Sequence, residues 1–215
     1  MNLASFITAL EKHYQNSRAP VVTLIAERGA TPFEILVSTL LSLRTRDAVT
    51  TAATNRLLEK ATTPEQLLSL TEKQIQRLIY PVGFYPTKAK RLKQICALLV
   101  SQFKGHVPDT MEGLLALPGV GRKTANLVLS EGFGQDAICV DTHVHRISNR
   151  IGLVETKTPE QTEDALRKTL PRKYWKRYNS LLVCFGQTLC APISPFCGQC
   201  PVARQCPKKG VVRSR

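Results

Sequence analysis

The C-terminal part of this sequence lacks acidic residues: positions 165–215 hold eleven lysines and arginines but no aspartate or glutamate. The chain also lacks a long apolar run, since none approaches the roughly 20 residues that a membrane-spanning helix requires. Aromatic residues make up only 6% of it, which argues against an amphipathic lipid anchor. The first eight residues contain no charged start, long apolar stretch or cleavage site, so we expect no secretion signal and no membrane partner.

Positive charge and cysteine content are the strongest global features that are present. A net charge of +14 over 215 residues indicates a polyanionic partner. A basic surface that only aids solubility is the alternative that charge alone leaves open. The seven cysteines crowd toward the C-terminus, which suits a reducing cytoplasm and metal ligation better than a disulfide framework. We therefore expect a cytoplasmic protein that is associated with the nucleoid.

Helix signals dominate the chain. Apolar residues at positions 3, 6, 7, 10 and 14 follow one helical face, and threonine-based start signals recur at positions 31, 63, 71 and 158. Asp47 is expected to cap a further helix. Residues 137–140 are the only short strand candidate. The pattern predicts an all-α fold of about ten helices with an irregular, cysteine-rich tail.

A glycine-rich turn at residues 117–122 (LPGVGR) is predicted to join two helices. Gly119 and Gly121 permit positive φ and let a phosphate approach the backbone closely. The amides that open the second helix would form an anion site at the positive end of its dipole. An ordinary helix–helix turn and a nucleotide P-loop are the alternatives. The P-loop fails because Lys123 follows Arg122 rather than glycine, and because a helix precedes the turn where a strand is required.

Four cysteines near the C-terminus form a second motif, Cys190-x6-Cys197-x2-Cys200-x5-Cys206. Four thiolates in one short loop are suited to a soft metal. From spacing alone the rival to an iron–sulfur cluster is a structural zinc site, although zinc ligands usually come as two close pairs and only one close pair is present here. The remaining cysteines have apolar neighbours and are expected in the core: Cys96, Cys139 and Cys184.

Residues 117–129 (LPGVGRKTANLVL), residues 140–143 (VDTH) and the cysteine spacing together resemble the signature of helix-hairpin-helix DNA glycosylases. The resemblance is closest to the endonuclease III group, and it extends over the whole chain in length and helix order. It implies a two-lobed, all-α enzyme of base excision repair. The implied parts are a six-helix barrel at residues 25–135 with its hairpin at about 112–131, and a second lobe from residues 1–24 and 136–215 whose loop at 190–206 holds one [4Fe–4S] cluster.

The resemblance also implies the catalytic groups. Lys123 is the implied nucleophile, which attacks C1′ of the deoxyribose, expels the base and forms a Schiff base that permits β-elimination. The attack needs a neutral amine, which burial, the adjacent Arg122 and the start of the second helix would favour. Asp141 is the implied carboxylate that stabilises the positive sugar. Because aspartate before an apolar helical run is also a favoured N-cap, both roles can hold together.

Two further loops, at residues 40–47 and 82–88, correspond to the segments that read the lesion in this family. Phe84 falls where the family places an apolar wedge, although a core aromatic is an equally good interpretation. Arg44 stands where endonuclease III ordinarily has glutamine, and arginine prefers guanine O6 and N7 or a phosphate. The implied DNA contacts are Gly119, Val120, Gly121, Arg122, Thr142, His143, Arg44, Arg46, Phe84 and Lys88.

The expected substrate is double-stranded DNA that contains a damaged base or an abasic site, bound by a monomer. Oxidised pyrimidines are the expected lesions. Arg44 motivates an alternative, a glycosylase for thymine or uracil mispaired with guanine. A non-catalytic iron–sulfur protein that binds DNA through the hairpin is a third possibility. Because the cysteine loop has little positive charge of its own, we expect Arg204, Lys208 and Lys209 to meet the DNA phosphates instead.

Overall fold

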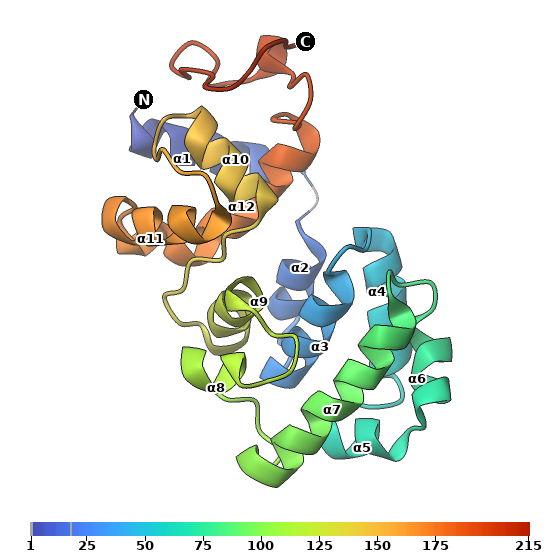
Figure 1. Cartoon of the computed structure of the whole chain (residues 1–215). Coiled ribbons are helices and arrows are strands. Elements are labelled where there is room, and N and C mark those ends of the chain that lie inside the picture. Colours follow the sequence, from blue (N-terminus) through green and yellow to red (C-terminus); the bar gives the residue numbers. More distant parts are fainter. Residues whose placement is uncertain (1, 18) are drawn as a thin grey trace. The chain divides into compact units, whose positions relative to one another are not determined.

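The computed structural model describes residues 2–17 and 19–215, and every regular element in those ranges is a helix (Figure 1). Contacts divide the chain into two compact units, residues 1–20 with 136–215, and residues 21–135. The resemblance implies a lobe at residues 25–135. Within the described ranges no helix combines the length and apolarity needed to cross a membrane. The predicted all-α fold is confirmed.

The unit at residues 21–135 is built around α3, whose side chains are almost all buried. The described residues of this unit form eight α-helices, of which α5, α8 and α9 are short, with five or six residues each. A π-helical turn, η1 (Val128–Gly132), continues α9. The helices are α2 (Val21–Glu27), α3 (Pro32–Ser42), α4 (Asp47–Leu58), α5 (Pro64–Ser69), α6 (Glu72–Ile79), α7 (Tyr85–Phe103), α8 (Met111–Leu115) and α9 (Arg122–Leu127).

The seven helices of this unit with an identified N-cap, α3 to α9, fall into two groups by how they begin. Four helices begin at a threonine whose hydroxyl accepts a backbone N–H three residues on: Thr31, Thr63, Thr71 and Thr110. By contrast, α4, α7 and α9 begin at Arg46, Phe84 and Gly121 with no side-chain cap. Asp47 is the first residue inside α4, so the prediction that it caps this helix is wrong. All three uncapped starts fall on segments that the sequence predicts to meet DNA.

Helix ends in the same unit share a different device, in which a basic side chain donates to the last carbonyls of a helix. Such carbonyls have no partner within the helix and carry the negative end of its dipole, so a cation there is favourable. Lys88 serves α3 in this way, Arg56 serves α6, and Lys93 serves α5. The accepting carbonyls belong to Leu41 and Leu43, to Leu78 and Tyr80, and to Leu68 and Leu70.

The other unit packs α12 (Trp175–Thr188) against α1 (Leu3–Gln15) and α10 (Thr142–Arg150). Its core includes Phe6, Tyr178 and Phe185. Residues 137–140 are buried but extended without a partner strand in the described ranges, so the strand candidate is wrong. Instead, the Asn179 side chain donates to the carbonyl of Cys139. The remaining elements are α11 (Pro159–Thr169) and two 3₁₀ turns, η2 (Arg172–Tyr174) and η3 (Cys197–Gln199).

Candidate functional site

The glycine-rich turn joins α8 to α9, as the sequence predicts (Figure 1). Gly119 has a φ of 76°, which side-chain-bearing residues rarely adopt. Gly121 has a φ of −103°, so of the two glycines only Gly119 uses the positive φ that glycine permits. Leu117 and Val120 are buried and anchor the turn from below. The turn therefore presents a short stretch of backbone between two buried apolar residues.

Lys123 and Arg122 occupy the first turn of α9, and both side chains are exposed. The opposite side of the helix is buried through Thr124, Ala125 and Leu127. The expectation that burial favours the neutral amine of Lys123 is therefore wrong for the protein without DNA. The other two expected features, the helix start and the neighbouring Arg122 charge, are both present.

Asp141 is the N-cap of α10, in agreement with the helix-capping interpretation. Its Oδ1 atom accepts the backbone N–H groups of His143 and Val144, each at 2.9 Å. These bonds fix the carboxylate at the helix start. Thr142 is exposed beside it. Asp141 belongs to the unit at 1–20 and 136–215, whereas Lys123 belongs to the unit at 21–135.

His143 contacts a residue that sequence reasoning missed. Arg146 Nη2 lies 3.1 Å from His143 Nδ1. Because a guanidinium carries only donors, Nδ1 accepts, and the neutral ring holds its proton on Nε2. Gly186 of α12 makes room for this contact, since a Cβ there would lie 2.3 Å from His143 Nδ1. His145 instead bonds Thr162 at 2.6 Å, so the two histidines have different partners.

The four C-terminal cysteines line one small enclosed cavity of about 30 Å³. Burial raises the pKa of the Cys200 and Cys206 thiols, and the negative charges of the other cysteines of the motif add to that effect. The four sulfur atoms are thus near enough to interact. In the described ranges, however, no three cysteine, histidine or carboxylate side chains already stand in the arrangement of a metal site.

Two arginines of α10 fasten the start of the cysteine loop. Arg150 is buried; its Nη1 atom donates to Cys190 Sγ at 3.4 Å and to the Ala191 carbonyl at 2.6 Å. Arg146 Nη2 donates to the Cys190 carbonyl at 2.9 Å. The sequence signal for this pair is their spacing of four residues on one helix face, which sequence reasoning did not use.

The two loops after α3 and α6 carry the other predicted DNA contacts. Arg44 and Arg46 are exposed. Phe84 is 62% exposed, so its interpretation as a core aromatic is wrong. Lys88, in contrast, is only 8% exposed and donates to three acceptors inside the protein. The expectation that Lys88 contacts DNA directly is wrong because its ammonium is already desolvated and bound.

Basic residues near the C-terminus are partly paired with acidic residues from elsewhere in their unit. Lys209 lies 2.8 Å from Glu155, Arg177 lies 3.3 Å from Glu11, and Arg172 lies 2.7 Å from Asp136. Lys208 and Arg204 are exposed. The lopsided charge of the sequence is therefore smaller on the surface of the unit than the count of lysines and arginines indicates.

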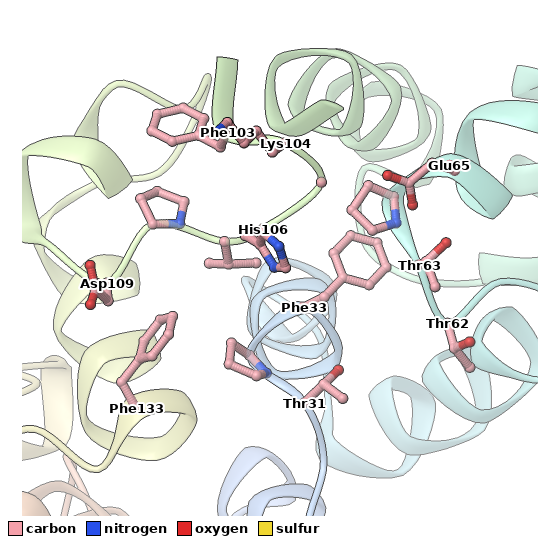
Figure 2. Close-up of a pocket in the computed structure, with 15 residues that line it drawn as sticks. Thr31, Phe33, Thr62, Thr63, Glu65, Phe103, Lys104, His106, Asp109 and Phe133 are labelled. Carbon is pink, nitrogen blue, oxygen red and sulfur yellow. The ribbon is translucent and has the colours of Figure 1, made fainter. Parts of the chain in front are cut away.

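A cavity of about 770 Å³ lies in the unit at 21–135 (Figure 2). The starts of α3 and α5, the loop after α7 and Phe133 line it, with Glu65, His106 and Asp109 among its polar groups. None of the predicted site residues lines this cavity. The predicted chemistry therefore belongs to exposed turns and helix starts.

Residues 37–172 match the HhH-GPD superfamily base excision DNA repair protein family. The chain belongs to this superfamily. It is 48% identical over 189 residues to endonuclease III of Thermotoga maritima, covering 86% of this chain and 89% of the relative. It is 42% identical over 200 residues to endonuclease III-like protein 1 of Mus musculus, covering 88% of this chain and 67% of the relative. This HhH-GPD protein is accordingly a bifunctional glycosylase and lyase of base excision repair.

Solved structures agree with the sequence relatives. A non-covalent endonuclease III–DNA complex superposes with a TM-score of 0.84 at 32% identity, covering 97% of this chain and 96% of that one. A trapped endonuclease III–DNA covalent intermediate superposes with a TM-score of 0.81 at 31% identity, covering 97% of each chain. The HhH-GPD fold is thus shared over nearly the whole length, and the relationship supports DNA binding by this chain.

Proposed function

We propose that this glycosylase removes oxidised pyrimidines from double-stranded DNA through Lys123 and then nicks the strand 3′ to the abasic site. The carrying observation is that Lys123 is an exposed residue in the first turn of α9, directly after the glycine-rich turn. The neutral amine bonds to C1′ while the base leaves with a proton. Opening of the sugar ring yields a Schiff base, loss of a C2′ proton expels the 3′ phosphate, and water then releases the lysine.

The exposure of Lys123 means that its low-dielectric surroundings must come from the DNA. A bound duplex displaces water from the first turn of α9, and desolvation disfavours an ammonium. The positive charge of Arg122 and the helix start act in the same direction. The amine is thus activated when substrate arrives.

Asp141 is proposed to stabilise the positive charge that develops on the sugar. Its Oδ1 atom accepts two backbone N–H groups of α10, and these hydrogen bonds hold the carboxylate in a fixed position. The Oδ2 atom then serves the sugar and the proton transfers. The same residue therefore caps a helix and acts in the reaction.

The DNA surface is proposed to include three uncapped helix starts of the unit at 21–135, at Arg46, Phe84 and Gly121. A helix start attracts phosphate through its outward N–H groups and its dipole. The other helices of the unit with an identified N-cap use a threonine side chain there, which leaves less need for an outside acceptor. Backbone contacts of Gly119 and Val120 and a side-chain contact of Arg122 complete this proposed surface. In the other unit, the side chains of Thr142 and His143 are proposed to contact DNA.

Arg44 and Phe84 are proposed to read the lesion. The Arg44 guanidinium carbon lies 5.7 Å from the centre of the Phe84 ring, and both side chains are exposed. Phe84 would fill the gap left by a base that has turned out of the helix. Arg44 would then donate to the base opposite, with guanine as the best acceptor.

Cys190, Cys197, Cys200 and Cys206 are proposed to hold one [4Fe–4S] cluster. The fit is supported by the shared cavity, the electrostatic coupling of the thiols and the Arg150 guanidinium beside Cys190, which offsets negative charge. When bound, such a cluster cross-links the loop and can exchange one electron. Visible absorption with iron and zinc analysis separates it from a zinc site.

Borohydride trapping on abasic duplex DNA tests the proposal. Wild type should give a covalent adduct that Lys123→Ala loses, while Lys60→Ala, which removes an exposed lysine of the same unit, should trap as wild type does. An adduct that persists in Lys123→Ala would contradict the assignment of the nucleophile. Wild type that binds DNA without trapping would support the non-catalytic alternative.

A panel of duplexes tests the substrate. Thymine glycol should be excised faster than uracil or thymine opposite guanine. The reverse order would favour the mismatch glycosylase that Arg44 motivates. A monomer in sedimentation is expected in either case.

A further inference from the structure

Two loops of the unit at 21–135 show an unusual backbone at their exposed tips. The first loop, residues 43–46, follows α3, and the second loop, residues 80–84, follows α6. Arg44 has a φ of 53° and Phe84 a φ of 59°, in the left-handed region that residues with side chains rarely adopt. Such backbones persist only where the surroundings hold them.

Lys88 of α7 lies directly beneath the first loop. Its ammonium has three N–H groups, and each has an acceptor: the Leu41 carbonyl at 2.9 Å, the Leu43 carbonyl at 2.6 Å and Thr45 Oγ1 at 3.3 Å. The Leu41 carbonyl lies at the end of α3, whereas the Leu43 carbonyl and the Thr45 hydroxyl lie in the loop. The side chain thus fixes the direction in which the chain leaves α3.

Thr45 also contacts the second loop. Its Oγ1 atom also accepts the backbone N–H of Gly83 at 3.1 Å. The approach is so close that a Cβ at position 83 would lie 2.6 Å from the Arg44 carbonyl oxygen. The backbones of the two loops are therefore in direct contact. The Thr45 hydroxyl connects them, because it contacts both Lys88 and the Gly83 N–H.

Burying Lys88 is costly, because no carboxylate is among its hydrogen-bond partners. A buried charge without an opposite charge is unfavourable even when it is hydrogen-bonded. Burial accordingly lowers the pKa of Lys88 to about 8. Lys93 caps α5 with the same pair of bonds, at 2.9 and 2.6 Å, from a less buried position. Helix capping alone therefore does not require the burial seen at Lys88.

We propose that Lys88 is a positioning residue that joins the two loops into one reading element and so sets the opposite-base preference of the enzyme. The inference rests on the proposed roles of Arg44 and Phe84. Lys88 acts through Thr45 and the end of α3, which hold Arg44 at a set distance from Phe84 before DNA arrives. Without the Lys88 ammonium, the loop backbone at Arg44 would no longer be held in one conformation, and the Arg44 side chain would lose its fixed direction.

The first experiment needs no DNA. Limited trypsin digestion of the full chain, followed by mass spectrometry, reports cleavage after Arg44 and Arg46. Wild type and Lys93→Met should resist at these sites, whereas Lys88→Met and Thr45→Val should be cut at least fivefold faster. Thr45→Ser keeps the hydroxyl and should behave as wild type. Equal protection in all five proteins would overturn the proposal.

The second experiment measures the ratio of excision rates for thymine glycol opposite guanine and opposite adenine. An arginine–guanine contact predicts a preference of about tenfold or more in wild type. Lys88→Met should reduce it to about twofold or less, and Lys93→Met should leave it unchanged despite the same type of lost helix cap. Lys88→Met should add nothing in an Arg44→Ala background, because the two residues act in series.

The two readouts separate the possible failures. A preference that survives in Lys88→Met, or that falls equally in Lys93→Met, overturns the proposal. Wild type without any preference removes the proposed role of Arg44 and with it the specificity role of Lys88. The joining of the loops is then decided by the digestion alone, in which protection of Lys88→Met overturns it and selective cleavage supports it.

Discussion

Gly119 and Gly121 look alike in the sequence but differ in their backbone conformation and in the space available for a Cβ atom. Gly119 has a φ of 76°, and a Cβ there would lie 2.3 Å from Arg91 Nε. Gly121 has a φ of −103° with nothing within 4 Å of a Cβ. The steric demand of the turn is therefore concentrated in one residue.

Gly119→Ala should lower the free energy of unfolding by about 1–2 kcal/mol, the cost of a left-handed backbone for an L-residue. Gly121→Ala is the matched control and should change it by less than about 0.5 kcal/mol. Urea denaturation followed by circular dichroism measures both. Equal losses in the two variants would contradict the distinction.

Glu131 is a half-buried carboxyl in η1 that sequence reasoning did not single out. Burial raises its pKa to about 7, the nearby Glu27 adds to the rise, and a hydrogen bond from Thr23 at 3.3 Å opposes it. The folded state thus holds a proton that the unfolded chain releases near pH 4.5. Stability contributed by this group is complete below that pH and is lost as the pH rises to about 7.

Glu131→Gln should remove this pH dependence, because the amide does not titrate. Above pH 7 the variant should be more stable than wild type, by up to about 3 kcal/mol. Thermal unfolding between pH 4 and 8 measures the difference. Parallel pH profiles for the two proteins would show that Glu131 ionises freely in the fold.

Among the irregular segments, the cysteine loop depends on a contact that its own motif does not contain. Arg215 N–H donates to the Pro195 carbonyl at 2.8 Å, and the Gly198 N–H donates to the Arg215 carbonyl at 2.8 Å. The Arg215 guanidinium lies 4.0 Å from the centre of the Phe196 ring. Residue 215 thus closes the loop through both backbone and side chain.

Deletion of residues 213–215 should loosen the loop more than Arg215→Ala, which keeps both backbone bonds. Visible absorption after exposure to a chelator reports how fast the proposed cluster is lost. We expect loss at least threefold faster in the deletion and a smaller effect in the substitution. Identical rates in the deletion and wild type would show that residue 215 does not hold the loop.

Helices respond to local sequence in a way that explains which were predictable. Thr31, Thr63 and Thr71 cap helices as the proline after the first two and the Thr-x-x-Gln pattern of the third indicate. Asp47 does not, since α4 begins with Arg46 as its cap position. An acidic residue in the first turn is favourable whether or not it is the cap, so its presence alone does not fix the first residue of the helix.

Considered over its full length, the chain carries a net charge of +14, but ion pairs reduce the number of cations available to DNA. Lys208 is exposed, while its neighbour Lys209 lies 2.8 Å from Glu155. The two adjacent lysines therefore need not contribute equally. A count of charges from the sequence treats the two lysines as equivalent.

Lys208→Gln should reduce the slope of log affinity against log salt by about 0.9, the value for one lost phosphate contact. Lys209→Gln should reduce it by less, because Glu155 already neutralises that charge. Fluorescence anisotropy over a range of salt concentrations measures the slopes. Two unchanged slopes would remove both lysines from the DNA surface.

Local patterns along the chain were sufficient to predict the helices, the glycine turn, the capping role of Asp141 and the four-cysteine loop, because each depends on residues within one or two turns of one another. The burial of Lys88, the clasp of Arg150 on Cys190 and the exposure of Phe84 were not predictable in this way. The contacts of Lys88 and Arg150 join residues 40 or more positions apart in the sequence, and the exposure of Phe84 likewise depends on the packing around it. Whether such groups face water or the interior is settled by packing energies that involve the whole fold, and no short segment contains them.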